Sequence, residues 1–223
     1  MGEQDLDGGS PPCLLHEVAA DWTSVVDPQQ VRDVARWRKV ERERLLANRI
    51  AMEPKLRAQQ TAALTEQLSV VIPSDGRTVS LYWPIRGEPD LREWMRQRFE
   101  GGMRIALPVA TAYGRPLEFR EWCPGAPMAR GLWKIPYPAD GAEVRPDVVV
   151  APLVGFDTAG FRLGYGGGFF DRTLAVFTPR PLVVGVGYGS AALRTIFPQP
   201  HDIGMDWIVT ESAPPQRFAR DGR

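Results

Sequence analysis

The sequence predicts an α/β fold, in which one domain holds a mainly parallel sheet with helices on both faces, a three-layer, Rossmann-like arrangement. Strand-like and helix-like segments alternate through the second half of the 223-residue chain, which is typical of parallel strands joined by helices. The runs 148–154 and 182–186 are apolar throughout, as expected for central strands covered on both faces. We expect this domain to span 28–212, between a flexible extension over 1–27 and a tail over 213–223.

The first part of the domain predicts two helices. Asp27 and Pro28 form a helix start signal, and the pattern continues to about Met52 before Pro54 interrupts it. A second helix is predicted over 55–68. On the first helix, apolar residues share roughly one face and basic residues cover much of the rest: Val31, Val34, Trp37, Leu45 and Met52 against Arg32, Arg36, Arg38, Lys39, Arg42, Arg44 and Arg49.

The remainder of the chain predicts strands separated by helices and turns. Helices are expected over 89–100 and 173–177. Strands are expected at 79–83, 104–108, 116–122, 148–154, 182–186 and 207–210. Ligands of parallel sheets bind at the carboxyl ends of the strands, so we expect the site in the loops that follow them.

The composition excludes several classes of protein. Hydrophobic residues make up 43% and charged residues 24%, which is typical of a globular chain. The 27 basic and 27 acidic residues cancel, which removes the long-range attraction that nucleic-acid binders use. No apolar run approaches the roughly 18–20 residues that span a bilayer, and Cys13 and Cys123 cannot build a disulfide framework. We therefore expect a cytoplasmic protein with neither a nucleic-acid nor a membrane partner. We also expect it to act on small molecules, as a monomer or a homodimer.

A glycine-rich loop is the strongest chemical signal. Residues 155–172 follow an expected central strand and contain glycines at four of five positions, 164 and 166–168. Glycines let several backbone N–H groups converge on phosphate oxygens, and Arg162 and Arg172 add bidentate charge. A flexible connection is the alternative, but the strand–glycine–helix context favours a phosphate site.

Asp171 has two possible roles at the start of the following helix. It can hold a Mg²⁺ that bridges nucleotide phosphates, because this ion takes only one or two protein carboxylates. It can equally cap the helix, and chemistry alone favours the cap.

Three segments make the chain recognisable. Residues 156–157, 160–172 and 201–211 closely resemble the 5-formyltetrahydrofolate cyclo-ligase family, and the resemblance extends over about 31–211. Further matching pieces are found at 83–88, 106–109 and 133–138. This combination is far more specific than the glycines alone.

The resemblance implies an ATP-dependent ring closure. Members of the family convert 5-formyltetrahydrofolate into 5,10-methenyltetrahydrofolate with ATP as co-substrate and Mg²⁺ as cofactor. The formyl oxygen attacks the γ-phosphorus, N10 attacks the activated carbon, and phosphate departs. This chemistry requires alignment and charge stabilisation rather than a covalent protein nucleophile.

The resemblance also assigns residues. It implies ATP binding by Arg38, Arg162, Leu163, Gly164, Tyr165, Gly166, Gly167, Gly168, Phe169 and Phe170. It implies substrate binding by Trp83, Glu88, Trp133, Tyr165 and Phe169. It implies catalytic roles for Arg162, Tyr165 and Arg172, and Mg²⁺ ligation by Asp171 and Asp202.

Glu88 and the two tryptophans suit a folate ring. One carboxylate can accept both the ring N–H and the exocyclic amine of a pterin, although a lone loop glutamate is otherwise an exposed charge. Trp83 and Trp133 offer flat faces for ring contacts, and Trp83, in a half-buried strand, has a core role as its alternative.

Two positions depart from the family pattern. Val34 stands where the family has a lysine four residues before the arginine that Arg38 matches, and Arg36 or Lys39 are candidates to compensate. A solvated helix face is the alternative for most of these charges. Phe170 stands where the family has a tyrosine. These departures leave open a divergent member that acts on another substrate and a non-catalytic folate- or nucleotide-binding protein.

Overall fold

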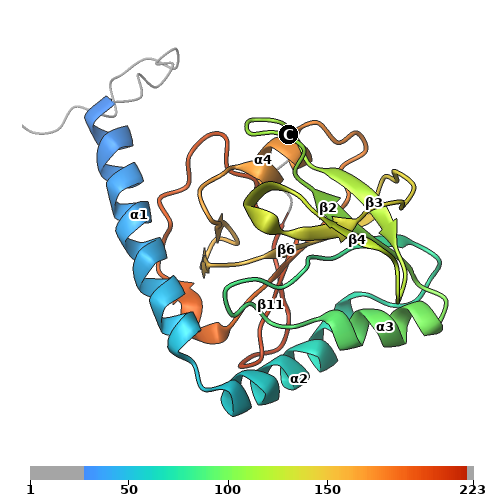
Figure 1. Ribbon diagram of the computed structural model, residues 1–223. Coiled ribbons are helices and arrows are strands. Elements are labelled where there is room, and N and C mark those ends of the chain that lie inside the picture. Colours follow the sequence, from blue (N-terminus) through green and yellow to red (C-terminus); the bar gives the residue numbers. More distant parts are fainter. Residues whose placement is uncertain (1–27, 220–223) are drawn as a thin grey trace, which may run out of the picture.

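The computed structural model describes residues 28–219, and the extension expected over 1–27 lies outside them, as do residues 220–223 (Figure 1). Within these residues the α-helices are α1 (Pro28–Ala51), α2 (Pro54–Val71), α3 (Arg92–Glu100) and α4 (Phe169–Ala175). The two N-terminal helices are confirmed, and the second extends to Val71 instead of ending at 68. α4 begins directly after the glycines, as the strand–glycine–helix pattern predicts, and so includes the four residues before 173.

The main sheet contains all six expected strands and one more. In spatial order its strands are β12 (Gln216–Arg217), β11 (Trp207–Val209), β9 (Leu182–Val186), β6 (Val148–Pro152), β1 (Thr78–Ser80), β2 (Arg104–Val109) and β3 (Glu118–Trp122). The five inner strands are parallel, and β3 and β12 pair antiparallel at the edges. The expected C-terminal tail therefore contributes an edge strand.

The strand order reverses between β1 and β6. After β1 the chain builds β2 and β3 on one side, and it then crosses to β6, β9 and β11 on the other. The loops that leave the carboxyl ends of β1 and β6 therefore start side by side and diverge, which creates the crevice where α/β sheets bind ligands.

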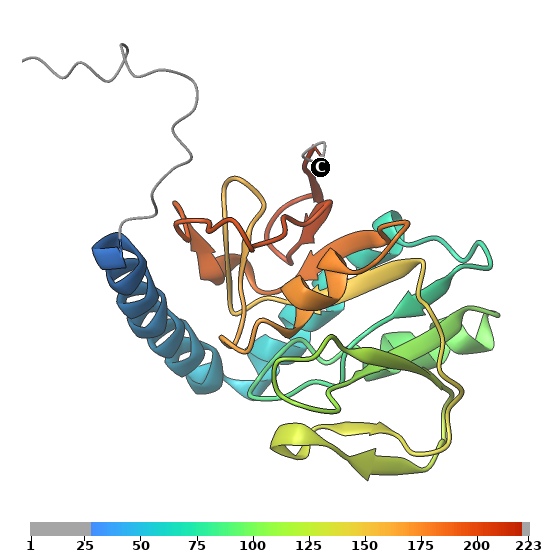
Figure 2. The same ribbon diagram turned by 90° about the horizontal axis from the view of Figure 1, so that it is seen from above.

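Helices cover both faces of the sheet, so the three-layer α/β prediction is confirmed. Figure 1 shows α2 and α3 below the sheet and α4 above it, and Figure 2 shows the same layers from above. In β6, Val148 and Val150 pack against α2 and α3, whereas Val149 and Ala151 pack toward α4. This alternation follows from the two-residue period of a strand.

α1 lies against the loops beyond the sheet rather than on either face. Its Leu45 packs with Val154, Leu163 and Ile196, which belong to loops and short strands after β6 and β9. The expected apolar face is only partly right, because Val31 is 41% exposed. The inward stripe instead combines apolar and basic residues at 34, 38, 42, 45 and 49.

Several short elements were not predicted. β7 (Gly155–Asp157), β8 (Arg162–Leu163) and β10 (Ala192–Leu193) form a small sheet, and β4 (Met128–Arg130) and β5 (Pro136–Pro138) form a hairpin. Two 3₁₀ turns are η1 (Leu132–Lys134) and η2 (Gly189–Ala191). No helix within 28–219 combines the length and the apolar character needed to cross a membrane.

Candidate active site

Two loops meet at the point where the strand order reverses. The loop after β1 carries Glu88, and the loop after β6 carries the glycines and Tyr165. The Tyr165 hydroxyl donates a hydrogen bond of 2.7 Å to Glu88 Oε1. The expected folate carboxylate and the expected phosphate loop are therefore in direct contact.

Arg49 joins both loops to α1. Its Nε donates to the Arg86 carbonyl at 3.0 Å, and its Nη1 donates to the Leu153 carbonyl at 3.1 Å. Its Nη2 donates to the Tyr165 hydroxyl and lies 4.0 Å from Glu88 Oε1. The side chain is 6% exposed. This guanidinium is therefore a buried group that connects α1 to both loops, and it is not part of a solvated helix face.

Glu88 is buried, so the alternative of an exposed loop charge is wrong. Its side chain is 2% exposed, and Oε2 accepts the Ile85 N–H at 2.9 Å. Burial raises the pKa of Glu88, and the positive charge of Arg49 opposes that rise. Burial and the charge of Glu88 also raise the pKa of Tyr165, so its hydroxyl stays protonated and donates.

The glycine loop offers unpaired backbone donors. Gly166 and Gly168 have φ of 93° and 63°, a left-handed conformation that glycine adopts without strain. The amide N–H groups of residues 164–168 donate no hydrogen bond to any other part of the described chain. Consecutive free amides in such a loop form an anion-binding concavity.

Two arginines donate hydrogen bonds to carbonyl oxygens of the same loop. Arg42 Nε donates to the Gly164 carbonyl at 2.6 Å, and the Arg172 guanidinium donates to the Gly167 carbonyl. Arg172 also lies over the Phe169 ring, 5.5 Å from its centroid. Positive charge is thus concentrated where the free amides are.

Asp171 does not cap α4, so the preference for a capping role is wrong. The N-cap residue is Gly168, which has no side chain to bond the helix. Asp171 Oδ2 pairs with Arg162 at 2.7 Å, and Oδ1 accepts the Ile203 N–H at 3.3 Å. The carboxylate faces the segment that contains Asp202.

Asp202 is held by Arg38. Arg38 Nη1 donates to Asp202 Oδ1 at 3.2 Å, while its other nitrogens donate to the Ile196 and Phe197 carbonyls, each at 2.9 Å. Burial by itself would raise the pKa of Asp202, but Arg38 and the Gln199 N–H bring it below the usual value. Asp202 is therefore ionised at neutral pH.

Asp171 and Asp202 are oxygen donors of the kind that Mg²⁺ takes from proteins, and each is paired with an arginine here. Asp171 bonds the amide of residue 203, which follows Asp202 directly, so the two acidic residues belong to one neighbourhood. Residues 28–219 contain no cluster of three or more metal-ligating side chains. One or two carboxylates with phosphate oxygens is the usual donor set for Mg²⁺, so the oxygen donors suit this ion.

An aromatic group borders the glycines. The hairpin tip carries Trp133, which is 52% exposed and meets Phe169 edge to face at 5.3 Å and Tyr113 at 5.5 Å between ring centroids. A Cβ on Gly167 would lie 2.9 Å from the Phe169 ring and 3.3 Å from Trp133. Glycine is needed at 167 because the two rings occupy the space of a side chain.

Other expected residues lie further from this centre. Trp83 packs against the apolar cluster between the sheet and helices α2 and α3, and the Arg92 guanidinium lies over its ring. The Leu163 side chain is 1% exposed in the cluster beside α1, so only its backbone faces the loop. Phe170, in the first turn of α4, packs against the apolar cluster between this helix and the sheet, with the Arg162 guanidinium over its ring.

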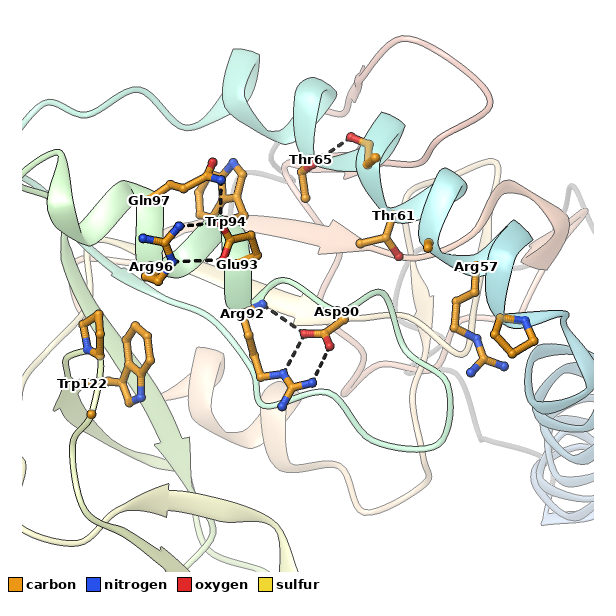
Figure 3. A pocket seen from close by; sticks show the side chains of 15 residues that line it. Arg57, Thr61, Thr65, Asp90, Arg92, Glu93, Trp94, Arg96, Gln97 and Trp122 are labelled. Atoms are coloured by element: carbon orange, nitrogen blue, oxygen red, sulfur yellow. Dashed lines mark hydrogen bonds and ion pairs between the residues drawn. The ribbon is translucent and has the colours of Figure 1, made fainter.

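One wide groove lies away from these residues. It has a volume of about 820 Å³ and separates α2 from α3 (Figure 3). Arg57, Asp90, Arg92 and Trp122 are among its lining residues, and none of the expected site residues is. Its size therefore carries no argument for the active site.

Arg42 and Arg49 were missed by the sequence analysis, which assigned most charges of the first helix to solvent. A usable signal existed, because 38, 42, 45 and 49 follow the three- and four-residue spacing of one helix face. Since Leu45 lies on that face, its basic neighbours point the same way.

Comparison with known proteins identifies the family. The family model of 5-formyltetrahydrofolate cyclo-ligases matches residues 34–211. A 5-formyltetrahydrofolate cyclo-ligase of Mycolicibacterium smegmatis is 34% identical over 174 residues, which cover 74% of this chain and 89% of that protein. One of Escherichia coli K12 is 32% identical over 142 residues, which cover 60% and 78%. The solved structure of Aquifex aeolicus 5,10-methenyltetrahydrofolate synthetase superposes with a TM-score of 0.71 at 28% identity, over 83% of this chain and 94% of that chain. This chain therefore belongs to the 5-formyltetrahydrofolate cyclo-ligase family.

Proposed function

We propose that this chain closes 5-formyltetrahydrofolate into 5,10-methenyltetrahydrofolate and converts ATP into ADP and phosphate in the same reaction. One observation carries the proposal. The loop whose amides are free for phosphates also contains Tyr165, which is bonded to the buried carboxylate Glu88. A single loop is therefore in reach of both a triphosphate and a pterin ring.

The glycine loop is the proposed triphosphate site. Its free amides at 164–168 bind phosphate oxygens, and Arg162 and Arg172 spread the charge that develops on the transferred phosphoryl group. These donors are fixed before the nucleotide arrives, so little reorganisation opposes the reaction.

Activation of the formyl oxygen is the chemical task. A formamide oxygen is a poor leaving group. Its attack on the γ-phosphorus releases ADP and leaves the oxygen phosphorylated, and this oxygen departs as part of inorganic phosphate when N10 attacks the formyl carbon. Tyr165 lies between the glycine amides and Glu88, where its protonated hydroxyl orients the folate next to the triphosphate. Alignment of this kind lowers the barrier without a covalent intermediate on the protein.

Glu88 is the proposed anchor of the pterin ring. Its two oxygens already accept hydrogen bonds from the Tyr165 hydroxyl and the Ile85 N–H. The ring N–H and exocyclic amine of a pterin are the same kind of donor. We propose that the ring replaces the Tyr165 hydroxyl at Oε1, which frees this hydroxyl for the substrate.

Asp171 and Asp202 are the proposed magnesium ligands. When bound, Mg²⁺ neutralises charge on the β- and γ-phosphates. Arg162 and Arg38 hold the two carboxylates in place.

The exposed, unbridged thiol of Cys123 suits the reducing cytoplasm that we propose as the location.

The direct test follows the product by its absorbance. We expect purified protein to form 5,10-methenyltetrahydrofolate from 5-formyltetrahydrofolate only when ATP and Mg²⁺ are both present. Folate binding without turnover would instead indicate a binding protein. ATP binding without any folate binding would indicate a family member with another substrate.

The charge on Glu88 predicts a pH dependence. The carboxylate accepts pterin donors only when ionised, and burial raises its pKa above 4.5. Affinity for 5-formyltetrahydrofolate should therefore fall as the pH drops through this raised value, with a midpoint above 4.5. Arg49→Met should move the midpoint further up, because Arg49 lowers the pKa, and Arg49→Lys should move it less. Calorimetric titration at several pH values measures the midpoint, and an identical profile in Glu88→Gln would disprove the assignment.

Asp171→Asn separates a metal ligand from a structural ion pair. Asn keeps one acceptor oxygen, for either Arg162 or the Ile203 N–H, and loses the charge. We expect a folded protein with a large loss of turnover and a raised Mg²⁺ requirement for what remains. Asp75→Asn is the control, because it weakens a surface Asp–Arg pair that precedes β1, at the edge of the sheet opposite the glycines. If Mg²⁺ titrations of wild type and Asp171→Asn coincide, the metal is bound elsewhere.

A further inference from the structure

One cation in the site has no anionic partner. The side chain of Arg42 is half-buried, and its single protein contact through Nε is the Gly164 carbonyl at 2.6 Å. Its terminal nitrogens Nη1 and Nη2 have no acceptor within residues 28–219, and it forms no ion pair with the described acidic residues. Two hydrogen-bond donors are therefore available next to the free amides.

The guanidinium lies directly over the glycine loop. A Cβ built on Gly166 would stand 3.3 Å from Arg42 Cζ and 3.5 Å from each terminal nitrogen. The missing side chain at 166 thus allows this close approach. A phosphate bound by the loop amides lies beside the outer edge of the guanidinium, which presents two parallel N–H donors.

The other basic residues of α1 are engaged or distant. Arg38 is bound to Asp202 and to two carbonyl oxygens. The candidates for compensation, Arg36 and Lys39, are exposed, and the Arg36 side chain is 76% exposed beside Asp33. Val34, where the family pattern has a lysine, is buried. No cation therefore stands at that position.

We infer that Arg42 is the α1 residue that binds the triphosphate of the nucleotide. This inference rests on the proposed function. Arg42 then compensates for the missing lysine at position 34, because it lies one helical turn beyond Arg38 on the same face of α1. Arg38 holds the loop that contains Asp202 in place. Burial, followed by the nearby charge of Arg38, lowers the pKa of Arg42, and the charge of Glu43 opposes this effect only in part.

Binding measurements test this inference. The variants are Arg42→Gln, Arg42→Lys and the matched control Arg44→Gln, in which a residue of the same helix loses its charge beside Glu41 on the surface. Calorimetry with MgATP and with inorganic tripolyphosphate measures the affinity. We expect Arg42→Gln to weaken both ligands by roughly 10- to 100-fold, the effect of one charged hydrogen bond. Arg42→Lys should lose less, since it keeps the charge without the planar fork.

Kinetics separates phosphate binding from a structural role. We expect Arg42→Gln to raise the KM for ATP and to leave the KM for 5-formyltetrahydrofolate near that of wild type. Equal losses for both substrates, or unchanged nucleotide affinity in the folded Gln and Lys variants, would overturn the assignment of Arg42 while the proposed function stands. Failure of the wild-type protein to bind MgATP would instead overturn the proposed function, and the assignment with it.

Discussion

The buried guanidinium of Arg49 is the contact on which the site depends. It binds one carbonyl from the loop after β1, one from the loop after β6, and the hydroxyl that reaches Glu88. Unpaired buried donors and an unbalanced buried carboxylate are each costly, so α1 and the two loops are stable in this arrangement only together. The sheet supplies the crevice, because its strand order reverses between β1 and β6, and Arg49 determines how the two loops fill it.

The pairing of donors and acceptors also determines which groups of the phosphate loop are free. Arg42 and Arg172 donate to the carbonyl oxygens of Gly164 and Gly167, so the free amides of that loop outnumber its free carbonyl groups. Asp171 and Asp202 each balance an arginine at the border of the loop. The result is a surplus of donors in a partly buried place, and a polyanion is the ligand that such a surplus fits.

The fold was predictable because it depends on long, uninterrupted signals. The apolar run of β6 and the glycines after it are unambiguous in the sequence, whereas the hairpin of β4 and β5 is too short and proline-rich to show periodicity. The site was predictable as a set of loops but not as a set of contacts. Asp171 is a residue type that often caps helices, but it bonds Arg162 instead. Arg49 is a residue type that usually lies on the surface, but it is buried. Tertiary partners decide such positions, and they are distant in sequence.

A double-mutant cycle between Arg49 and Glu88 tests the central claim most directly. The free energy of unfolding at neutral pH is measured for wild type, Arg49→Met, Glu88→Gln and the double variant. Because each single variant leaves the other buried partner without its counter-charge, we predict that the double variant loses less stability than the sum of the single losses, with a coupling of at least about 1 kcal/mol. Additive losses would show that the two residues act independently and would contradict the account.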